Sequence, residues 1–548
     1  MPYSAPPLRT IALRFVPLAG LIFSLILYSN SHTTSLHISA FTRPSTLDDN
    51  DETDDFNEQG TSGAHTYRPD GLLEVNPART HPIFDLIDLA HARWKFKLAR
   101  ASTTLDEAVQ EYVRRYNRRP PRGFDKWWDY VTAHNVQLPD EYDQIHRDLA
   151  PFWGYHPTYL QQLQASEELR ADSFTLGKNA SSESGGRVAV LRTAFRDAHG
   201  SSEWNPEKFL GGAYSIMEVL KEVEHDLPEF RAVVSPHDSP TLFADYEIKR
   251  AALDAADRGT YVDPDTLVPG EKLGWLSGCA PSSPARQAPA HPIPNPSTPA
   301  KNKTKTKTFI FDHRKSMDPC THPTHLTHVG EFLAHPHPHP APSPHLLPRF
   351  AYCATQMHHD IQVPTLSGWV RGPGTSKEDE EDEADPPWEA RLDARLSWRG
   401  ANTGMWHAPH TRWRDAQRAR LVGLAGALNG SVRVLLPGAA GTGETGSGNR
   451  NDKRSGSGSW GGNGSGSARA ARVGEGVEMK RALVNPAMMD VAFAGEPVGC
   501  HEETCGVLRR EFEWRKRQDA REAGRFKYVI DVRSRSRAVQ LGVLFNLT

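Results

Sequence analysis

The chain has 548 residues, so at about 150 residues per domain we expect roughly three or four structural units. Its 64 lysines and arginines nearly balance its 67 acidic residues, giving a formal charge of −3. This balance excludes the strongly basic composition of a chain that binds nucleic acid over its whole surface, and we expect no nucleic-acid partner.

The first apolar segment, residues 11–28, is near the lower length limit for a membrane-spanning helix. Arg9 and Arg14 lie toward its N-terminal end and acidic residues follow it, so the positive-inside rule predicts a cytosolic tail of residues 1–10. Because we find no small-residue cleavage site, we predict an uncleaved signal anchor. A cleaved secretion signal is the alternative.

The body of the chain would then lie in the lumen of the Golgi or endoplasmic reticulum, as a single-pass type II membrane protein. Five N-glycosylation sequons fit this location, and they begin at Asn179, Asn302, Asn429, Asn463 and Asn546. The chain also has five cysteines. Cys500 and Cys505 are spaced for a small disulfide loop, whereas Cys279, Cys320 and Cys353 leave at least one cysteine outside any pair.

Residues 29–76 are polar without a sustained period, and we interpret them as a disordered stalk. Packed structure is expected from about His81, where a helical apolar pattern begins. Thr104 and Glu107 form the sequence signature of a capping box, which predicts the start of a second helix. A third helix is predicted to carry an aromatic stripe that we interpret as core packing: Phe124, Trp127, Trp128 and Val131.

Strand-like runs then alternate with helical patterns, which is typical of an α/β fold. The predicted strands are Arg231–Ser235, Thr308–Asp312, Ser431–Leu436 and Phe526–Val532. A helix is predicted over Ala244–Asp257, with Gly259 able to end it. Three low-complexity inserts interrupt the pattern as surface loops: 280–307, 374–386 and the Gly/Ser-rich 438–468.

The segment Trp398-Arg399-Gly400-Ala401-Asn402-Thr403-Gly404 suggests a loop that binds a nucleotide sugar. Glycines allow backbone N–H groups to approach a ligand, and a guanidinium grips phosphate oxygens in a planar fork. The later Arg418 and Arg420 fall at helical spacing, and we interpret them as a solvated helix face. The candidate donor-binding residues are therefore Arg399, Gly400, Asn402, Thr403 and Gly404.

Many separated segments of the chain resemble the fungal branch of the capsule-associated glycosyltransferase family, which includes capsule xylosyltransferases and Rumi-like protein O-glucosyltransferases. They include HPIFDLIDLAHARW, DEYDQIHRDLAPFWG, SPHDSP, LFADYEIKRAALDAA, FIFDHRKSMDPC, FAYCATQMHHDIQVP, PPWEARLDARLSWRGANTG, NPAMMDVAF and FKYVIDV. The resemblance covers most of His81–Val532, with the segments in the family's order. It implies an inverting transferase of the GT-B type, with two Rossmann-like lobes that use a UDP-sugar as donor substrate and need no further cofactor.

On this resemblance, 77–370 would form the helical region and first lobe, 371–390 an acidic linker, and 391–548 the second lobe. Xylose or glucose would pass to a hydroxyl group of a glycan or glycoprotein. The family's catalytic carboxylate matches Asp238, which would take the acceptor's proton as general base. From the residues alone, a turn residue or a helix cap is the favoured interpretation of Asp238, and the base role rests on the resemblance.

Two features set limits on this assignment. The chain departs from the family pattern after Asp531, so we expect an incomplete second lobe and leave a catalytically inactive family member as an alternative. A histidine-rich segment has His335-Pro336-His337-Pro338-His339 at its centre. Because imidazoles at such density can bind zinc or copper, a metal-binding luminal protein is another alternative. We interpret that segment as a low-complexity repeat and expect no metal site.

Overall fold

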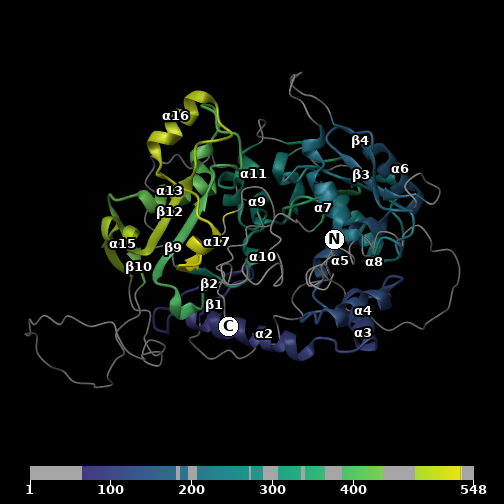
Figure 1. Ribbon diagram of the computed structural model, residues 1–548, viewed down its shortest axis with the longest axis horizontal. Helices are drawn as coiled ribbons and strands as arrows, with labels where there is room; N and C mark the ends of the chain where they lie inside the picture. Colours follow the sequence, from purple (N-terminus) through teal and green to yellow (C-terminus); the bar gives the residue numbers. More distant parts are fainter. Residues whose placement is uncertain are drawn as a thin grey trace, which may run out of the picture.

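The computed structural model shows a mixed α/β protein with two larger sheets and an N-terminal layer of helices (Figure 1). The residues it describes are 65–179, 186–195, 206–221, 223–237, 239–268, 270, 273–287, 307–334, 340–363, 386–435, 476–530 and 532. The α/β class expected from the sequence is confirmed. The predicted anchor 11–28 lies outside the described residues, and within them no helix has the length and apolar character needed to cross a membrane.

A small antiparallel sheet stands where the end of the stalk was predicted. Its strands are β1 (Thr66–Tyr67), β2 (Leu72–Glu74) and β6 (Thr308–Ile310), in the order β1-β2-β6. Leu73 is fully buried and packs in a cluster with Phe309. The stalk prediction therefore needs correction for these residues, because their apolar side chains find a partner strand far along the chain.

The helical layer begins with α2 (Pro82–Arg100), α3 (Leu105–Tyr116) and α4 (Phe124–Ala133), which lie along the lower edge of Figure 1. It continues with α5 (Asp143–Leu149), η4 (Ala150–Gly154) and α6 (Pro157–Glu167). The capping box of Thr104 and Glu107 is formed as predicted. Val131 is buried, as core packing requires, whereas Phe124 and Trp127 are half-buried and line a pocket.

The first sheet has the order β4-β3-β5-β7-β8, with β3 antiparallel to both neighbours and β5, β7 and β8 mutually parallel. Its strands are β3 (Phe174–Lys178), β4 (Ala189–Thr193), β5 (Phe230–Val234), β7 (Arg349–Ala351) and β8 (Ile361–Gln362). Helices α7 (Gly211–Leu220) and α8 (Tyr246–Asp257) contribute Ile216 and Ile248 to its apolar core. Gly259 follows α8 with φ of +65°, as a helix-ending glycine should.

The second sheet has the order β13-β12-β9-β14, and all its neighbouring strands are parallel. Its strands are β9 (Asp393–Gly400), β12 (Met489–Ala494), β13 (Trp514–Arg515) and β14 (Phe526–Val529). The helices of this region are α13 (Gln417–Gly426), α15 (Arg481–Met488), α16 (Glu502–Glu511) and α17 (Ala520–Ala523). Trp398, Val491 and Phe493 form an apolar face that packs against Val422 of α13.

Short elements connect these layers. They are η5 (Pro206–Phe209), η6 (Pro264–Thr266), η7 (Gly274–Gly278), α9 (Pro284–Gln287), α10 (His313–Ser316), η8 (Pro323–Thr327), α11 (Gly330–Leu333), η10 (Trp388–Ala390) and η11 (Trp413–Asp415). The hairpin of β10 (Ser431–Val434) and β11 (Val477–Lys480) lies outside both larger sheets. The four predicted strands therefore all exist, but only β5 and β14 belong to the larger sheets.

Two disulfides staple different parts of the chain. Cys500 and Cys505 are bonded, as predicted. Cys279 and Cys320 are also bonded, across a sequence separation of 41. The fifth cysteine, Cys353, is buried next to β7 and belongs to neither disulfide.

Candidate functional site

The loop that follows β5 carries the predicted base. Asp238 itself lies outside the described residues, but the neighbouring segments, which end at His237 and resume at Ser239, are described. The carboxylate of Asp360 accepts hydrogen bonds from Thr241 N at 3.1 Å, Thr241 Oγ1 at 2.8 Å and Leu242 N at 2.9 Å. Asp360 is only 1% exposed, and burial raises its pKa against the opposing effect of these hydrogen bonds. A buried carboxylate therefore anchors this loop at the carboxyl end of a parallel strand.

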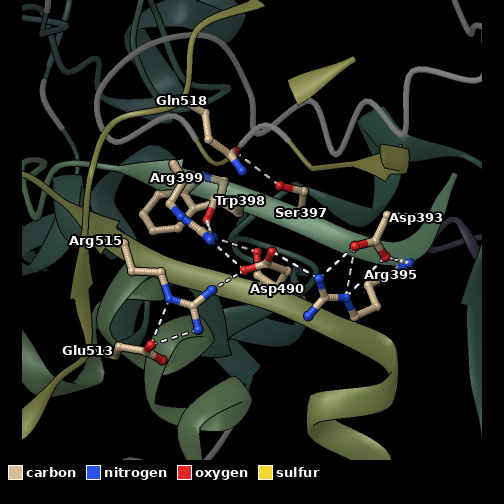
Figure 2. A network of polar contacts seen from close by, with 9 residues as sticks. All are labelled: Asp393, Arg395, Ser397, Trp398, Arg399, Asp490, Glu513, Arg515 and Gln518. Carbon is tan, nitrogen blue, oxygen red and sulfur yellow. Dashed lines mark hydrogen bonds and ion pairs between the residues drawn. The ribbon is translucent and has the colours of Figure 1, made fainter. Parts of the chain in front are cut away.

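Arg399 and Gly400 lie in β9 and not in a loop, which corrects that part of the prediction. The Arg399 guanidinium forms an ion pair with Asp490 on the neighbouring strand β12 and donates to the Asp490 carbonyl oxygen at 2.7 Å (Figure 2). The two side chains are 7% and 8% exposed. Arg399 is thus engaged inside the sheet, and its direct contact with a donor stays a prediction.

Two more arginines contact the same carboxylate. Arg515 of β13 forms an ion pair with Asp490, and Arg395 of β9 approaches it at 3.3 Å (Figure 2). Arg395 also pairs with Asp393 at 2.6 Å, and Arg515 with Glu513 at 2.7 Å. Three guanidinium groups and three carboxylates therefore balance in charge. We call these residues, with Arg399 and Asp490, the arginine network.

The sequence holds a signal for this strand that the glycine-rich interpretation overlooked. Arg395, Ser397 and Arg399 alternate with the apolar Leu396 and Trp398, which is the period of a strand with two different faces. The apolar face meets α13, and the polar face carries the arginine network.

The remaining candidate donor residues do form a loop after β9. The Asn402 side chain is buried and donates from Nδ2 to Val498 O at 2.7 Å, while its Oδ1 accepts from Val498 N at 2.9 Å. These bonds tie the loop after β9 to the loop after β12. Gly404 has φ of +123°, a conformation that favours glycine. The predicted pair Asn402 and Gly404 thus shape the loop.

Arg418 is the residue of this site that the sequence interpretation missed. Its Nε donates to Val532 O at 2.8 Å, and its Nη1 donates to Ala401 O at 2.8 Å and to both Thr403 O and Thr403 Oγ1, at 3.1 and 2.8 Å. The prediction of a solvated face is therefore wrong for Arg418, although Arg420 is exposed. The spacing of arginines along a helix could not indicate these contacts, because the hydrogen-bond partners of Arg418 lie in other segments.

The short helix α11 contacts the loop after β9 directly and is linked to the loop after β5 through Trp275. Gly330 N donates to the side-chain oxygen of Gln417 at 2.7 Å, and a Cβ atom on Gly330 would lie 2.9 Å from the carbonyl oxygen of Gly404. On its other side, Phe332 packs edge-on to Trp275 at 5.0 Å, and Trp275 packs edge-on to Phe243 at 4.9 Å. Because Phe243 belongs to the loop after β5, α11 joins the loop of the predicted base to the loop of the predicted donor site.

The histidine-rich segment forms no metal centre within the described part of the chain. His322 Nε2 lies 2.8 Å from Asp70 O, and His325 Nε2 lies 2.8 Å from Ser316 O, so both imidazoles bond to backbone carbonyls. His335, His337 and His339 lie outside the described residues. Of the sequons, Asn429 is exposed and Asn179 half-exposed, and the other three, Asn302, Asn463 and Asn546, also lie outside.

No protein-family model, curated protein or solved structure matches this chain. The segments that resemble capsule-associated glycosyltransferases, together with the geometry above, are therefore the basis for a functional proposal.

Proposed function

We propose that this protein is an inverting glycosyltransferase of the GT-B type, which transfers xylose or glucose from a UDP-sugar to a hydroxyl group of a glycan or glycoprotein. The donor would bind beside the loop after β9, and the acceptor beside the loop after β5. The proposed location is the Golgi or endoplasmic reticulum membrane, with the body of the chain in the lumen. This location rests on the apolar segment 11–28 and the sequons.

The observation that carries the proposal is the position of α11. A two-lobe transferase must bring its acceptor base and its donor phosphates to one place, from two separate sheets. Here the loops after β5 and β9 are linked through Phe332 on one side of α11 and Gly330 on the other. Both loops follow the carboxyl ends of parallel strands, where open α/β sheets bind their ligands.

The donor diphosphate would be recognised by backbone groups more than by Arg399. Arg418 holds the carbonyl oxygens of Ala401 and Thr403, which fixes the course of the loop. Helix α13 begins directly beside it, and Ala416 supplies no side-chain cap to its first turn. The N-terminal end of a helix favours bound anions through its N–H groups and its dipole. Together they would stabilise the negative charge that develops on the leaving UDP.

Asp238 is the proposed general base. Inversion requires a base that removes the proton of the acceptor hydroxyl while that oxygen attacks the sugar. Asp360 would act as a positioning residue, because it holds Thr241 and Leu242 only a few positions further along.

The test is a conservative substitution at the proposed base. Asp238→Asn should retain UDP binding by calorimetry but lower the rate of UDP release from UDP-glucose or UDP-xylose by about 10²–10⁴-fold. Asp263→Asn makes the same chemical change at an exposed cap of η6 and should leave the rate unchanged. Equal rates in the two variants would return Asp238 to the role of a turn residue.

A catalytically inactive family member is the second candidate, and the pairing of Arg399 with Asp490 favours it. That pairing withdraws one cation from any phosphate that binds nearby. Such a protein would bind UDP without releasing it from a UDP-sugar, so the binding and rate measurements above separate the two candidates.

A further inference from the structure

Helix α2 carries an apolar stripe that the described part of the protein leaves largely uncovered. Five apolar residues follow one another at intervals of four, three, four and four positions, so their side chains share one face of the helix: Ile83, Ile87, Ala90, Trp94 and Leu98. Such a face normally packs against a core. Here Trp94 is 48% and Leu98 40% exposed, and Ala90 between them and the start of the helix is exposed as well. Apolar surface that gathers in contact with water marks a site of interaction.

The contacts that hold α2 in place lie to one side of this stripe. All 19 residues of the helix are described, and only Pro82 among them is buried. Leu86 packs with the cluster around Leu73, and Lys97 pairs with Glu141 at 2.5 Å. Leu86 and Lys97 are three helical turns apart, so both contacts fall on the same side of the helix. α2 thus forms an outer edge of the protein, along the bottom of Figure 1, with its stripe outside these contacts.

Basic residues surround the exposed end of the stripe. The last ten residues of α2 contain no Asp or Glu and four basic side chains, which are Arg93, Lys95, Lys97 and Arg100. Glu141 neutralises Lys97 and is itself shared with Arg115, at 3.0 Å. Lys95 is exposed, and the Arg100 guanidinium lies over the Phe96 ring at 4.9 Å. Trp and Leu beside unneutralised cations are typical of a helix that lies in the interface of a membrane.

The course of the chain connects this helix to the predicted membrane anchor. The described chain starts at His65, whose Nε2 lies 3.7 Å from the Asp85 carboxylate of α2. Only residues 29–64 separate His65 from the apolar segment 11–28. A second, weak contact becomes effective when a tether holds both partners together, because the second binding step is then intramolecular. A bilayer that holds the segment 11–28 would therefore be available to α2 at a high local concentration.

We propose that the exposed stripe of α2 docks on the surface of a lipid bilayer with anionic headgroups, as a second membrane contact besides the predicted anchor. Trp94 and Leu98 would enter the boundary between headgroups and acyl chains. Lys95, next to Trp94, would reach the lipid phosphates. Docking would fix the orientation of the body of the protein relative to the membrane, and it does not depend on the proposed transfer reaction.

The experiment attaches a fluorophore to Leu98→Cys in the full chain, combined with vesicles of phosphatidylcholine and phosphatidylserine. The new thiol is labelled selectively, because Cys353 is buried and the other four cysteines form disulfides. Lipids that carry bromine on their acyl chains should quench this probe, because it would lie at their depth. The control Leu169→Cys carries the probe at a leucine that is 62% exposed just beyond α6, and the same lipids should leave it unquenched.

Charge variants of the labelled protein complete the test. Lys95→Ala should lower the ratio of docked to undocked probe about fivefold, the effect of one cation near an anionic surface. Lys221→Ala removes an exposed lysine elsewhere and should leave the ratio unchanged. The proposal is overturned if the brominated lipids quench neither probe or quench both equally. It is also overturned if probes at position 98 on different copies of the chain transfer energy to one another without lipid quenching, because a second copy then covers the stripe.

Discussion

The two larger sheets of this protein arrange their buried charges differently. The first sheet is packed around apolar residues such as Phe174, Ile248 and Phe350. Its buried charged groups lie apart, because Arg349 of β7 pairs with Glu167 at 2.6 Å while Asp360 holds a neighbouring loop. The second sheet has one apolar face, and its other face carries the arginine network across three strands, with one carboxylate shared by three arginines (Figure 2). Loss of that shared carboxylate should therefore affect several strands of the second sheet at once.

The same difference bears on function. An arginine whose carboxylate partner is buried with it binds a phosphate only at the cost of weakening that pair, because separating the two leaves an uncompensated charge. In the second sheet, Arg399 therefore acts within the strands, whereas Arg418 acts on the loop beyond them. The following predictions challenge this contrast, beginning with the largest expected effect.

Removing the shared carboxylate should damage the second sheet most. Asp490→Ala would leave Arg395, Arg399 and Arg515 without their common partner, and breaking a buried ion pair from one side costs about 3–5 kcal/mol. Urea denaturation measures the loss. The matched change Glu496→Ala removes the exposed partner of Arg509 and should cost less than about 1 kcal/mol. Similar costs for the two variants would show that the arginine network does not stabilise the sheet.

The two disulfides should differ in a predictable order. In the chain-entropy description, closing the 41-residue separation of Cys279 and Cys320 contributes about 4 kcal/mol, and closing the separation of 5 between Cys500 and Cys505 contributes about 2 kcal/mol. Paired Cys→Ala variants of each disulfide, compared by thermal unfolding, test this order. A larger loss from the short loop would mean that its local contacts outweigh chain entropy.

Acidification should loosen the helical layer beside the first sheet. His146 has a folded pKa of about 4, below the ordinary 6.5, so the unfolded chain takes up the proton first as the pH falls. The stability due to neutral His146 is complete above pH 6.5, and about 3 kcal/mol of it is lost by pH 4. His146→Phe should show a flatter dependence of melting temperature over this window. Parallel curves would contradict the assignment.

The smallest effect is expected at the anchor of the β5 loop. Asp360→Ala removes the acceptor of the buried Leu242 N, and one buried unsatisfied donor costs about 1–3 kcal/mol. The other two donors belong to the exposed Thr241, where water can replace the carboxylate. Relative to the wild type, the rate of proteolytic cleavage near residue 240 should rise by a larger factor than the rate of global unfolding. If only the global stability falls, Asp360 supports the sheet as a whole and not this loop.

Much of the fold follows from local sequence signals, and the site does so only in part. The Thr104 capping box, the start of β5 and the Cys500–Cys505 disulfide are set by residues close together in the chain, and each was predictable. The end of β9 was assigned to a loop because Arg399 stands beside Gly400 in a glycine-rich segment. Its partner Asp490 lies 91 residues further along, where spacing carries no information.

Arg418 was misjudged for the same reason. Its helix shows a regular polar pattern in the sequence. The Arg418 guanidinium, however, donates to the backbone oxygens of Ala401, Thr403 and Val532, which lie in other segments. Those contacts exist only after β9, α13 and the chain beyond β14 have come together. Sequence reasoning therefore recognised the loop after β9 but did not identify Arg418 as the arginine that holds it.

The most direct test of the proposed donor site is UDP binding by calorimetry to the wild type, Arg418→Ala and Arg420→Ala. Both variants remove one arginine from the first turns of α13, but only Arg418 holds the loop after β9. We predict that the wild type binds UDP, that Arg418→Ala weakens binding about 10- to 100-fold, and that Arg420→Ala stays within about twofold of the wild type. Absence of UDP binding in the wild type, or equal losses in the two variants, would contradict a donor site at this loop.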